Sequence, residues 1–177
     1  MQPDTFEGIY QTYKNKVYNT VLSYIQQIED TEEVTQDVFV EVHRSYHEFR
    51  QEAQVSTWIY RIAVNKSLDF LRRKSAQKRF AFFTNLFHQD TGEILHEAPD
   101  FEHPGALLEQ KENHSYLFKA LYNLPENQKT AFILTQIEDL SYIEAAKVME
   151  ITVASVEGLL HRAKANLRKK LERYYPT

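Results

Sequence analysis

The segment from Ser141 to Lys170 constrains the fold more than any other part of this 177-residue chain. Ser141 precedes an apolar run and is followed three residues later by Glu144, a pattern typical of a capping box at the start of a helix. After a turn near residues 150–151, Thr152 can cap a second helix. The second helix has an apolar stripe at helical spacing, formed by Val156, Leu160, Ala163, Leu167 and Leu171.

The opposite face of this second helix is polar and basic. It carries Ser155, Gly158, His161, Arg162, Ala165, Arg168 and Lys169. A short helix, a tight turn and a second helix with one buried stripe and one basic face are what a helix-turn-helix needs to bind duplex DNA. The segment therefore predicts a DNA-binding motif.

The rest of the chain also has helical patterning. With four Gly, five Pro and no strand-like alternation, the sequence predicts an all-α fold. We expect helices over residues 5–28, 31–49, 57–74, 106–121 and 125–137. Between about residues 80 and 104 the periodicity fails and turn-forming residues gather, which indicates a linker. The expected organisation is one small helical domain over residues 1–79, a linker over 80–105 and a helix-turn-helix domain over 106–177.

The net charge of −4 does not exclude nucleic acid as a partner, because the basic residues are locally concentrated. One cluster lies within residues 72–79 and another within 162–173, and local clusters determine phosphate affinity. Each cluster taken alone could equally be a solvated helix end, where cations are favourable.

The composition also narrows the classes of site and location that we expect. The absence of Cys excludes disulfides, thiolate zinc sites and a cysteine nucleophile. No apolar run approaches the length of a membrane span, and the first residues lack the blocks of a signal peptide. We therefore expect a cytoplasmic protein without membrane insertion.

Two further helical faces have distinct chemistry. Trp58, Arg61, Asn65, Asp69 and Arg72 share one side of the third expected helix, which suits stacking on bases and hydrogen bonding to their edges. The alternative is a solvated face on which Asp69 pairs with Arg72 or Arg73. The second expected helix begins with acidic residues, which complement the helix dipole and could also form a protein-binding patch.

These motifs together resemble bacterial RNA polymerase sigma factors. The stretch EDTEEVTQDVF at 29–39 resembles their core-polymerase-binding helix, and residues 49–73 resemble their melting and minus-ten-reading segment. The stretches LPENQK at 124–129, LSYIEAA at 140–146 and LHRAK at 160–164 resemble their C-terminal promoter-reading domain. The short linker in place of a middle domain is similar to the extracytoplasmic-function (ECF) group. Two signatures in the right order cover some two-thirds of the chain.

The resemblance implies a protein that binds core RNA polymerase, directs it to promoters and helps to melt the minus-ten region, without catalysis or cofactor. It implies polymerase binding by Asp30, Glu32, Glu33, Gln36 and Asp37. It implies minus-ten contacts by Phe49, Arg50, Ser56, Trp58, Arg61, Asn65, Asp69, Arg72 and Arg73. It implies minus-thirty-five contacts by Ser155, Glu157, Gly158, His161, Arg162, Lys164 and Arg168. The implied partners are core polymerase, duplex promoter DNA, the melted non-template strand and an anti-sigma factor.

The chain departs from the family pattern in the helix-turn-helix. Glu157 stands where the family usually has Lys or Arg, Leu159 where it often has Arg, and Gly158 where Ser is common. Glu157 suits the N-terminal end of a helix and could accept a hydrogen bond from a cytosine amino group. This pattern predicts either an unusual minus-thirty-five sequence or a weak contact with that element.

Other functional classes explain the sequence less well. A stand-alone helix-turn-helix regulator is the alternative, but it gives no task to the acidic second helix or the basic third helix. A helical scaffold leaves both signatures unexplained, and an enzyme is disfavoured because no metal motif, glycine-rich phosphate loop or nucleophile constellation is present. Four histidines, His88, His96, His103 and His114, have irregular spacing that does not predict a metal site.

Overall fold

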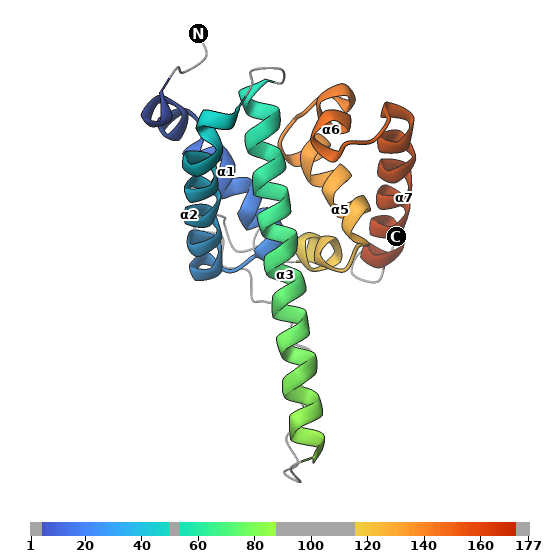
Figure 1. The fold of residues 1–177 in the computed structure, drawn as a ribbon. Coiled ribbons are helices and arrows are strands. Elements are labelled where there is room, and N and C mark those ends of the chain that lie inside the picture. Colours follow the sequence, from blue (N-terminus) through green and yellow to red (C-terminus); the bar gives the residue numbers. More distant parts are fainter. Residues whose placement is uncertain (1–4, 50–53, 88–115, 173–177) are drawn as a thin grey trace, which may run out of the picture.

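The computed structural model describes residues 5–49, 54–87 and 116–172, except for the side chains of residues 48 and 80–87. Within these ranges every regular element is a helix, as the sequence predicts (Figure 1). The N-terminal bundle consists of α1 (Phe6–Ile25), α2 (Ile28–Ser45), the short 3₁₀ helix η1 (Tyr46–Glu48) and α3 (Val55–Phe87). The C-terminal bundle consists of a helix at residues 116–122, α5 (Glu126–Phe132), the π-helical turn η2 (Ile133–Ile137), α6 (Tyr142–Met149) and α7 (Val153–Leu171).

The break between α1 and α2 differs from the sequence-based expectation. A single helix over residues 5–28 was expected, but α1 ends at Ile25 and α2 begins at Ile28. Gln26 adopts a left-handed conformation with φ 61°, and its buried side chain donates a hydrogen bond of 2.9 Å to the carbonyl of Phe118. This contact with a distant segment fixes the break, because Gln is not a residue that favours left-handed backbone locally.

Helix α3 is longer than expected. It continues to Phe87 instead of ending near residue 74, so the first part of the expected linker is helical. No Gly or Pro occurs between Lys74 and Phe87, and residues such as Ala76 and Gln77 favour helix. The remainder of the expected linker lies outside the described residues, as do His88, His96, His103 and His114.

The helix-turn-helix forms as the capping signals predict. Ser141 caps α6 through a reciprocal capping box in which its backbone N–H donates to the Glu144 carboxylate at 2.9 Å and its Oγ accepts from the Glu144 N–H at 3.3 Å. The Ser141 hydroxyl also donates to that carboxylate, and these bonds hold the pKa of Glu144 below its ordinary value. Thr152 caps α7 by accepting from the Ser155 N–H at 3.2 Å. The predicted apolar stripe is buried from Val156 to Leu167.

The two bundles share one hydrophobic core. In Figure 1 helix α3 lies between α1 and α2 on one side and the C-terminal bundle on the other. Helix α3 packs on α6, and α1 contacts η2. The Tyr60 hydroxyl donates to the Glu138 carboxylate across this junction at 3.1 Å, and burial raises the pKa of Glu138. Within the described ranges, no helix has the length and apolar character needed to cross a bilayer.

A buried lysine in the C-terminal bundle predicts a pH dependence of stability. Lys129 is only 5% exposed, its Nζ lies 4.8 Å from the ring centroid of Tyr122, and burial lowers its pKa to about 8. The unfolded chain therefore binds more protons than the folded chain between about pH 8 and the ordinary lysine pKa near 10.4. The free energy of unfolding is expected to rise with pH over this interval.

Replacing this lysine by an apolar side chain of similar length is expected to flatten that rise. Lys129→Met removes the cost of burying the cation and should increase the free energy of unfolding at pH 7 by on the order of 1 kcal/mol. Urea unfolding at several values between pH 7 and pH 9.5 measures both effects. The range stays below about pH 10, where buried Tyr24 and Tyr60, whose pKa values burial raises, act with the opposite sign. If the free energy of unfolding of Lys129→Met rose with pH as steeply as that of the parent chain, Lys129 would not be the source of the pH dependence.

Candidate polymerase and nucleic-acid interfaces

Helix α2 presents an acidic face to solvent. Its apolar stripe, Val34, Val38 and Val42, is buried in the N-terminal bundle. The opposite side exposes Glu29, Glu32, Glu33, Gln36 and Asp37. Four of the five predicted polymerase-binding residues therefore lie together on an open helical surface. The fifth, Asp30, is half-buried and forms an ion pair with Lys74 of α3.

Sequence reasoning missed one residue of this face. Val40 follows Gln36 and Asp37 at helical spacing and is 66% exposed, although it is apolar. The spacing alone could have located it beside the acidic residues. An exposed apolar side chain at the end of an acidic face gives the surface both charge and hydrophobic contact area, a combination found in protein–protein interfaces.

The start of α3 carries an aromatic platform. The rings of Phe49 and Trp58 are stacked, with centroids 4.7 Å apart and planes inclined by 27°. Both side chains are half-buried, as is Ser56 in the first turn of α3. Arg50, the remaining predicted residue of this group, lies outside the described residues. Stacked aromatic rings at the surface offer a planar apolar site for an unpaired base.

The polar face of α3 continues from this platform. Asn65, Asp69, Arg72 and Arg73 are exposed, and Arg61 is half-buried. Asp69 forms the local ion pair with Arg72 that the sequence suggested as an alternative, with Nη1 and Oδ1 3.2 Å apart. Apart from Phe49, which follows η1, the predicted minus-ten residues of the described chain therefore lie along α3, next to the junction between the bundles.

Two arginines of this face are engaged by the C-terminal bundle. Arg61 pairs with Glu150 at 2.7 Å and donates to the carbonyl of Lys147 at 2.6 Å. Arg72 donates through Nη2 to Glu126 Oε2 at 2.7 Å and through Nε to Glu126 Oε1 at 3.2 Å. These long-range pairs were not predicted from the sequence, because neither acidic residue is near its partner in the chain.

The predicted minus-thirty-five residues lie on the outer side of α7. Figure 1 places α7 at the edge of the molecule, with α5 between it and α3. The exposed members are Ser155, Glu157, His161, Arg162, Lys164 and Arg168, and Gly158 is half-exposed. A Cβ on Gly158 would approach nothing closer than the Arg162 guanidinium at 3.9 Å, so the backbone does not require glycine there.

The Ser155 hydroxyl belongs partly to the cap, since its Oγ is 2.8 Å from the Thr152 hydroxyl. One hydroxyl of the predicted minus-thirty-five group is therefore engaged at the start of α7. The exposed predicted residues of α7 include three cations, Arg162, Lys164 and Arg168. They also include one carboxylate, Glu157, which lies near the start of the helix. The outer face of α7 therefore keeps the mixed charge that the sequence predicts.

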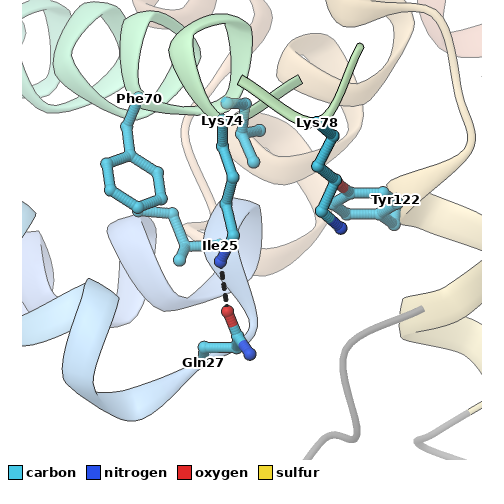
Figure 2. Close-up of a pocket in the computed structure, with 7 residues that line it drawn as sticks. Ile25, Gln27, Phe70, Lys74, Lys78 and Tyr122 are labelled. Carbon is cyan, nitrogen blue, oxygen red and sulfur yellow. Dashed lines mark hydrogen bonds between the residues drawn. The ribbon is translucent and has the colours of Figure 1, made fainter. Parts of the chain in front are cut away.

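One small pocket lies where α1, α3 and the helix at residues 116–122 meet, as Figure 2 shows. It is lined by Ile25, Gln27, Phe70, Leu71, Lys74, Lys78 and Tyr122. Lys74 crosses it to donate to the side chain of Gln27. Its volume of about 60 Å³ is far below the roughly 300 Å³ at which small-molecule sites begin. Among the described residues no cluster of His, Cys, Asp and Glu could hold a metal ion.

Two family models match the chain in the order of its two bundles. The model of sigma-70 region 2 matches residues 9–77, which cover most of α1, all of α2 and most of α3. The model of sigma-70 region 4 matches residues 114–167, which include the helix-turn-helix. The acidic face of α2, the aromatic platform and the polar face of α3 therefore fall within the first match, and the outer face of α7 falls within the second.

Curated relatives match almost the whole chain. The ECF RNA polymerase sigma-E factor of Haemophilus influenzae is 30% identical over 169 residues, which cover 94% of this chain and 87% of the relative. The ECF RNA polymerase sigma factor SigW of Bacillus subtilis is 27% identical over 172 residues, which cover 95% of this chain and 89% of the relative.

Solved structures share the fold. The sigma factor RpoE of Bartonella quintana, in complex with the anti-sigma factor NepR, matches with a TM-score of 0.69 and 18% identity over 94% of this chain and 96% of that one. CnrH, in complex with the cytosolic domain of CnrY, matches with a TM-score of 0.64 and 22% identity over 95% and 88% of the two chains. At these identities the likeness shows the arrangement of helices.

Proposed function

This chain belongs to the ECF group of RNA polymerase sigma factors, and from that premise we propose which of its surfaces carry the steps of promoter recognition. It binds core RNA polymerase, directs it to promoters and helps to melt the minus-ten region. In this proposal α2 binds polymerase, the start and polar face of α3 bind the melted strand, and α7 binds duplex DNA. The exposed acidic face of α2, aligned with the region 2 match, is the observation that carries the assignment of the polymerase contact.

The assignment of α3 rests on chemistry that distinguishes open from paired DNA. Melting needs no nucleophile, but it needs binding energy that is larger for the open strand than for the duplex. The stacked rings of Phe49 and Trp58 can receive an unpaired base, and stacking offsets the few kcal/mol that unstacking a base costs. Arg72 and Arg73 on the same helix supply positive charge for the adjacent phosphates.

The assignment of α7 follows the geometry of helix-turn-helix motifs, whose second helix lies in the major groove. Its exposed face carries His161, Arg162, Lys164 and Arg168 for DNA contacts, with Glu157 as a candidate acceptor for a cytosine amino group. We propose that residues 1–79 and 106–177 act as separate domains on the polymerase, joined by residues 80–105. The two family-model matches, which fall on either side of residues 78–113, support this division.

We further propose a cytoplasmic protein without catalysis of its own, since promoter recognition takes place beside the chromosome and uses the catalytic centre of the polymerase. An anti-sigma factor is the expected regulator. Two proteins with this fold have been solved in complexes, one with the anti-sigma factor NepR and one with the cytosolic domain of CnrY.

The direct test is transcription in vitro with core RNA polymerase that lacks any other sigma factor. Genomic DNA of the source organism serves as template, and the 5′ ends of the transcripts are sequenced. The proposal predicts start sites that depend on this chain and share two upstream elements at fixed spacing. A stand-alone regulator would instead bind a duplex site tightly without polymerase and give no chain-dependent start sites, which would refute the proposal.

A further inference from the structure

We propose that Glu126 and Glu150, which we call the acidic latch, compete with promoter phosphates for Arg72 and Arg61 of α3. In the free chain the latch holds the two bundles together and keeps these two arginines from binding DNA. The inference rests on the proposed role of α3 in binding the melted strand. It assigns a regulatory task to two residues of the C-terminal bundle that the sigma factor role does not otherwise use.

The first half of the latch joins α3 to the helix-turn-helix. Arg61 has one guanidinium nitrogen 2.7 Å from Glu150 Oε1 and another 2.6 Å from the Lys147 carbonyl oxygen. Two oxygen acceptors thus occupy neighbouring nitrogens of one guanidinium, which is the pattern in which arginine binds a phosphate. A phosphate of the melted strand cannot accept from the same N–H groups while Glu150 and Lys147 hold them.

The second half joins α3 to the start of α5. Both carboxylate oxygens of Glu126 accept from Arg72, at 2.7 Å from Nη2 and 3.2 Å from Nε. Such two-point pairing fixes the plane of the guanidinium as a phosphate would. The two halves of the latch hold positions 61 and 72, which are three turns apart on α3.

The backbone at Glu150 is unusual for an acidic residue. Glu150 has φ 56°, in the left-handed region where glycine is unstrained, and it ends α6 within the turn of the helix-turn-helix. A glycine would serve the turn at lower cost but would supply no carboxylate. The ion pair to Arg61 gives a role to a side chain that the turn itself does not need.

The latch occupies residues of only one of the two proposed DNA-binding faces. It engages α3, whereas the outer face of α7 lies on the other side of the C-terminal bundle and stays exposed (Figure 1). A closed chain can therefore keep its duplex-reading residues free while two cations of its strand-melting face are occupied. Opening of the junction becomes a step that separates duplex contact from melting.

The strength of the latch suits a reversible step. The side chains of Arg61 and Glu150 are 37% and 69% exposed, and those of Arg72 and Glu126 are 57% and 46% exposed. Exposed ion pairs contribute little each because water and salt screen them. Two such pairs together change the ratio of closed to open chain by about fivefold, which polymerase or DNA binding can overcome.

The test measures how often the two bundles separate in the 177-residue chain, without DNA or polymerase. Because the sequence contains no Cys, Asn15→Cys on α1 and Ala165→Cys on α7 can be labelled specifically with a dye pair. Both positions are exposed. Single-molecule energy transfer then reports the distance between the bundles, and the fraction of open chain is compared among variants at low salt.

The proposal predicts that Glu126→Gln with Glu150→Gln raises the ratio of open to closed chain about fivefold. The matched control, Glu7→Gln with Glu172→Gln, removes the same charge from exposed positions away from the junction and should leave the ratio unchanged. Arg61→Glu alone should open the chain, and Arg61→Glu with Glu150→Arg should close it again. No opening in the first variant, an equal opening in the control, or no closure by the charge swap would each overturn the latch.

Competition with DNA is measured separately, with the same full-length variants and a labelled single-stranded oligonucleotide of mixed sequence. The affinity of the chain for this oligonucleotide should rise about fivefold when Glu126 and Glu150 are both replaced by Gln. It should stay the same in the control variant. An opened variant with unchanged affinity would overturn competition for phosphate. The proposed function itself is judged by the transcription assay, so its failure is distinguishable from failure of the latch.

Discussion

Reversing the charge of Glu33 and Asp37 together is expected to lower chain-dependent transcription by core polymerase by at least about thirtyfold. The two residues are four positions apart on α2, exposed on the side opposite its buried valines. Charged groups that become desolvated in an interface cost about 2 kcal/mol or more when their pairing is lost, and reversal adds repulsion. The measurement is transcript yield against concentration of the variant, together with binding of the labelled chain to core polymerase.

The control must separate loss of the interface from a change in net charge. Glu7→Lys with Glu172→Lys reverses the same number of acidic charges at exposed positions of α1 and the end of α7. It should keep transcription within about threefold of the parent chain, because exposed charges away from an interface have small effects. Thermal unfolding should be similar for both double variants. If Glu33→Lys with Asp37→Lys were to transcribe as well as this control, α2 would not be the polymerase-binding surface.

Local signals explain why the sequence could predict the helix-turn-helix so closely. Ser141 with Glu144, and Thr152 ahead of an apolar stripe, each specify a helix start within a few residues. The stripe from Val156 to Leu167 is buried as its spacing requires. The acidic face of α2 was equally predictable, since its exposed residues alternate with buried valines at helical spacing.

Contacts between distant segments explain what the sequence could not show. Gln26 breaks the expected first helix because its side chain reaches the backbone of Phe118. The resemblance implies a polymerase contact for Asp30, but no local pattern showed that this residue pairs with Lys74 of α3. The pairs between Arg72 and Glu126 and between Arg61 and Glu150 likewise depend on how the two bundles dock, which no local pattern encodes.

The aromatic platform was predictable from the sequence only in part. The sequence placed Phe49 and Trp58 in the same minus-ten group, but their stacking depends on how the chain turns between η1 and α3. With ring centroids 4.7 Å apart, the two side chains form one surface. Since Trp58 is the larger ring, and it sits in the first turn of α3 beside the polar face, it is the side chain whose loss should most affect melting.

Trp58→Ala is expected to reduce open-complex formation on duplex promoter DNA about tenfold. Stacking of a base on an aromatic side chain contributes roughly 1–3 kcal/mol, and tenfold corresponds to about 1.4 kcal/mol. The interaction exists only when the base is unpaired, so its loss acts on melting rather than on the first contact with the duplex. Reactivity of unpaired thymines toward permanganate, measured against enzyme concentration, reports the effect.

Two comparisons distinguish stacking from damage to the fold, since Trp58 also packs against the core. Trp58→Phe keeps a ring above Phe49 and should retain most of the opening. On a template whose minus-ten region is already unpaired by mismatches, Trp58→Ala should give the parent level of transcription at saturating polymerase, since no melting is needed, while its affinity for that template stays about tenfold weaker because the stack is still missing. Equal defects in Trp58→Phe and Trp58→Ala, with both chains folded at the assay temperature, would rule out stacking as the role of this residue. An affinity for the mismatched template equal to that of the parent chain would place Trp58 in an earlier step, before the strands separate.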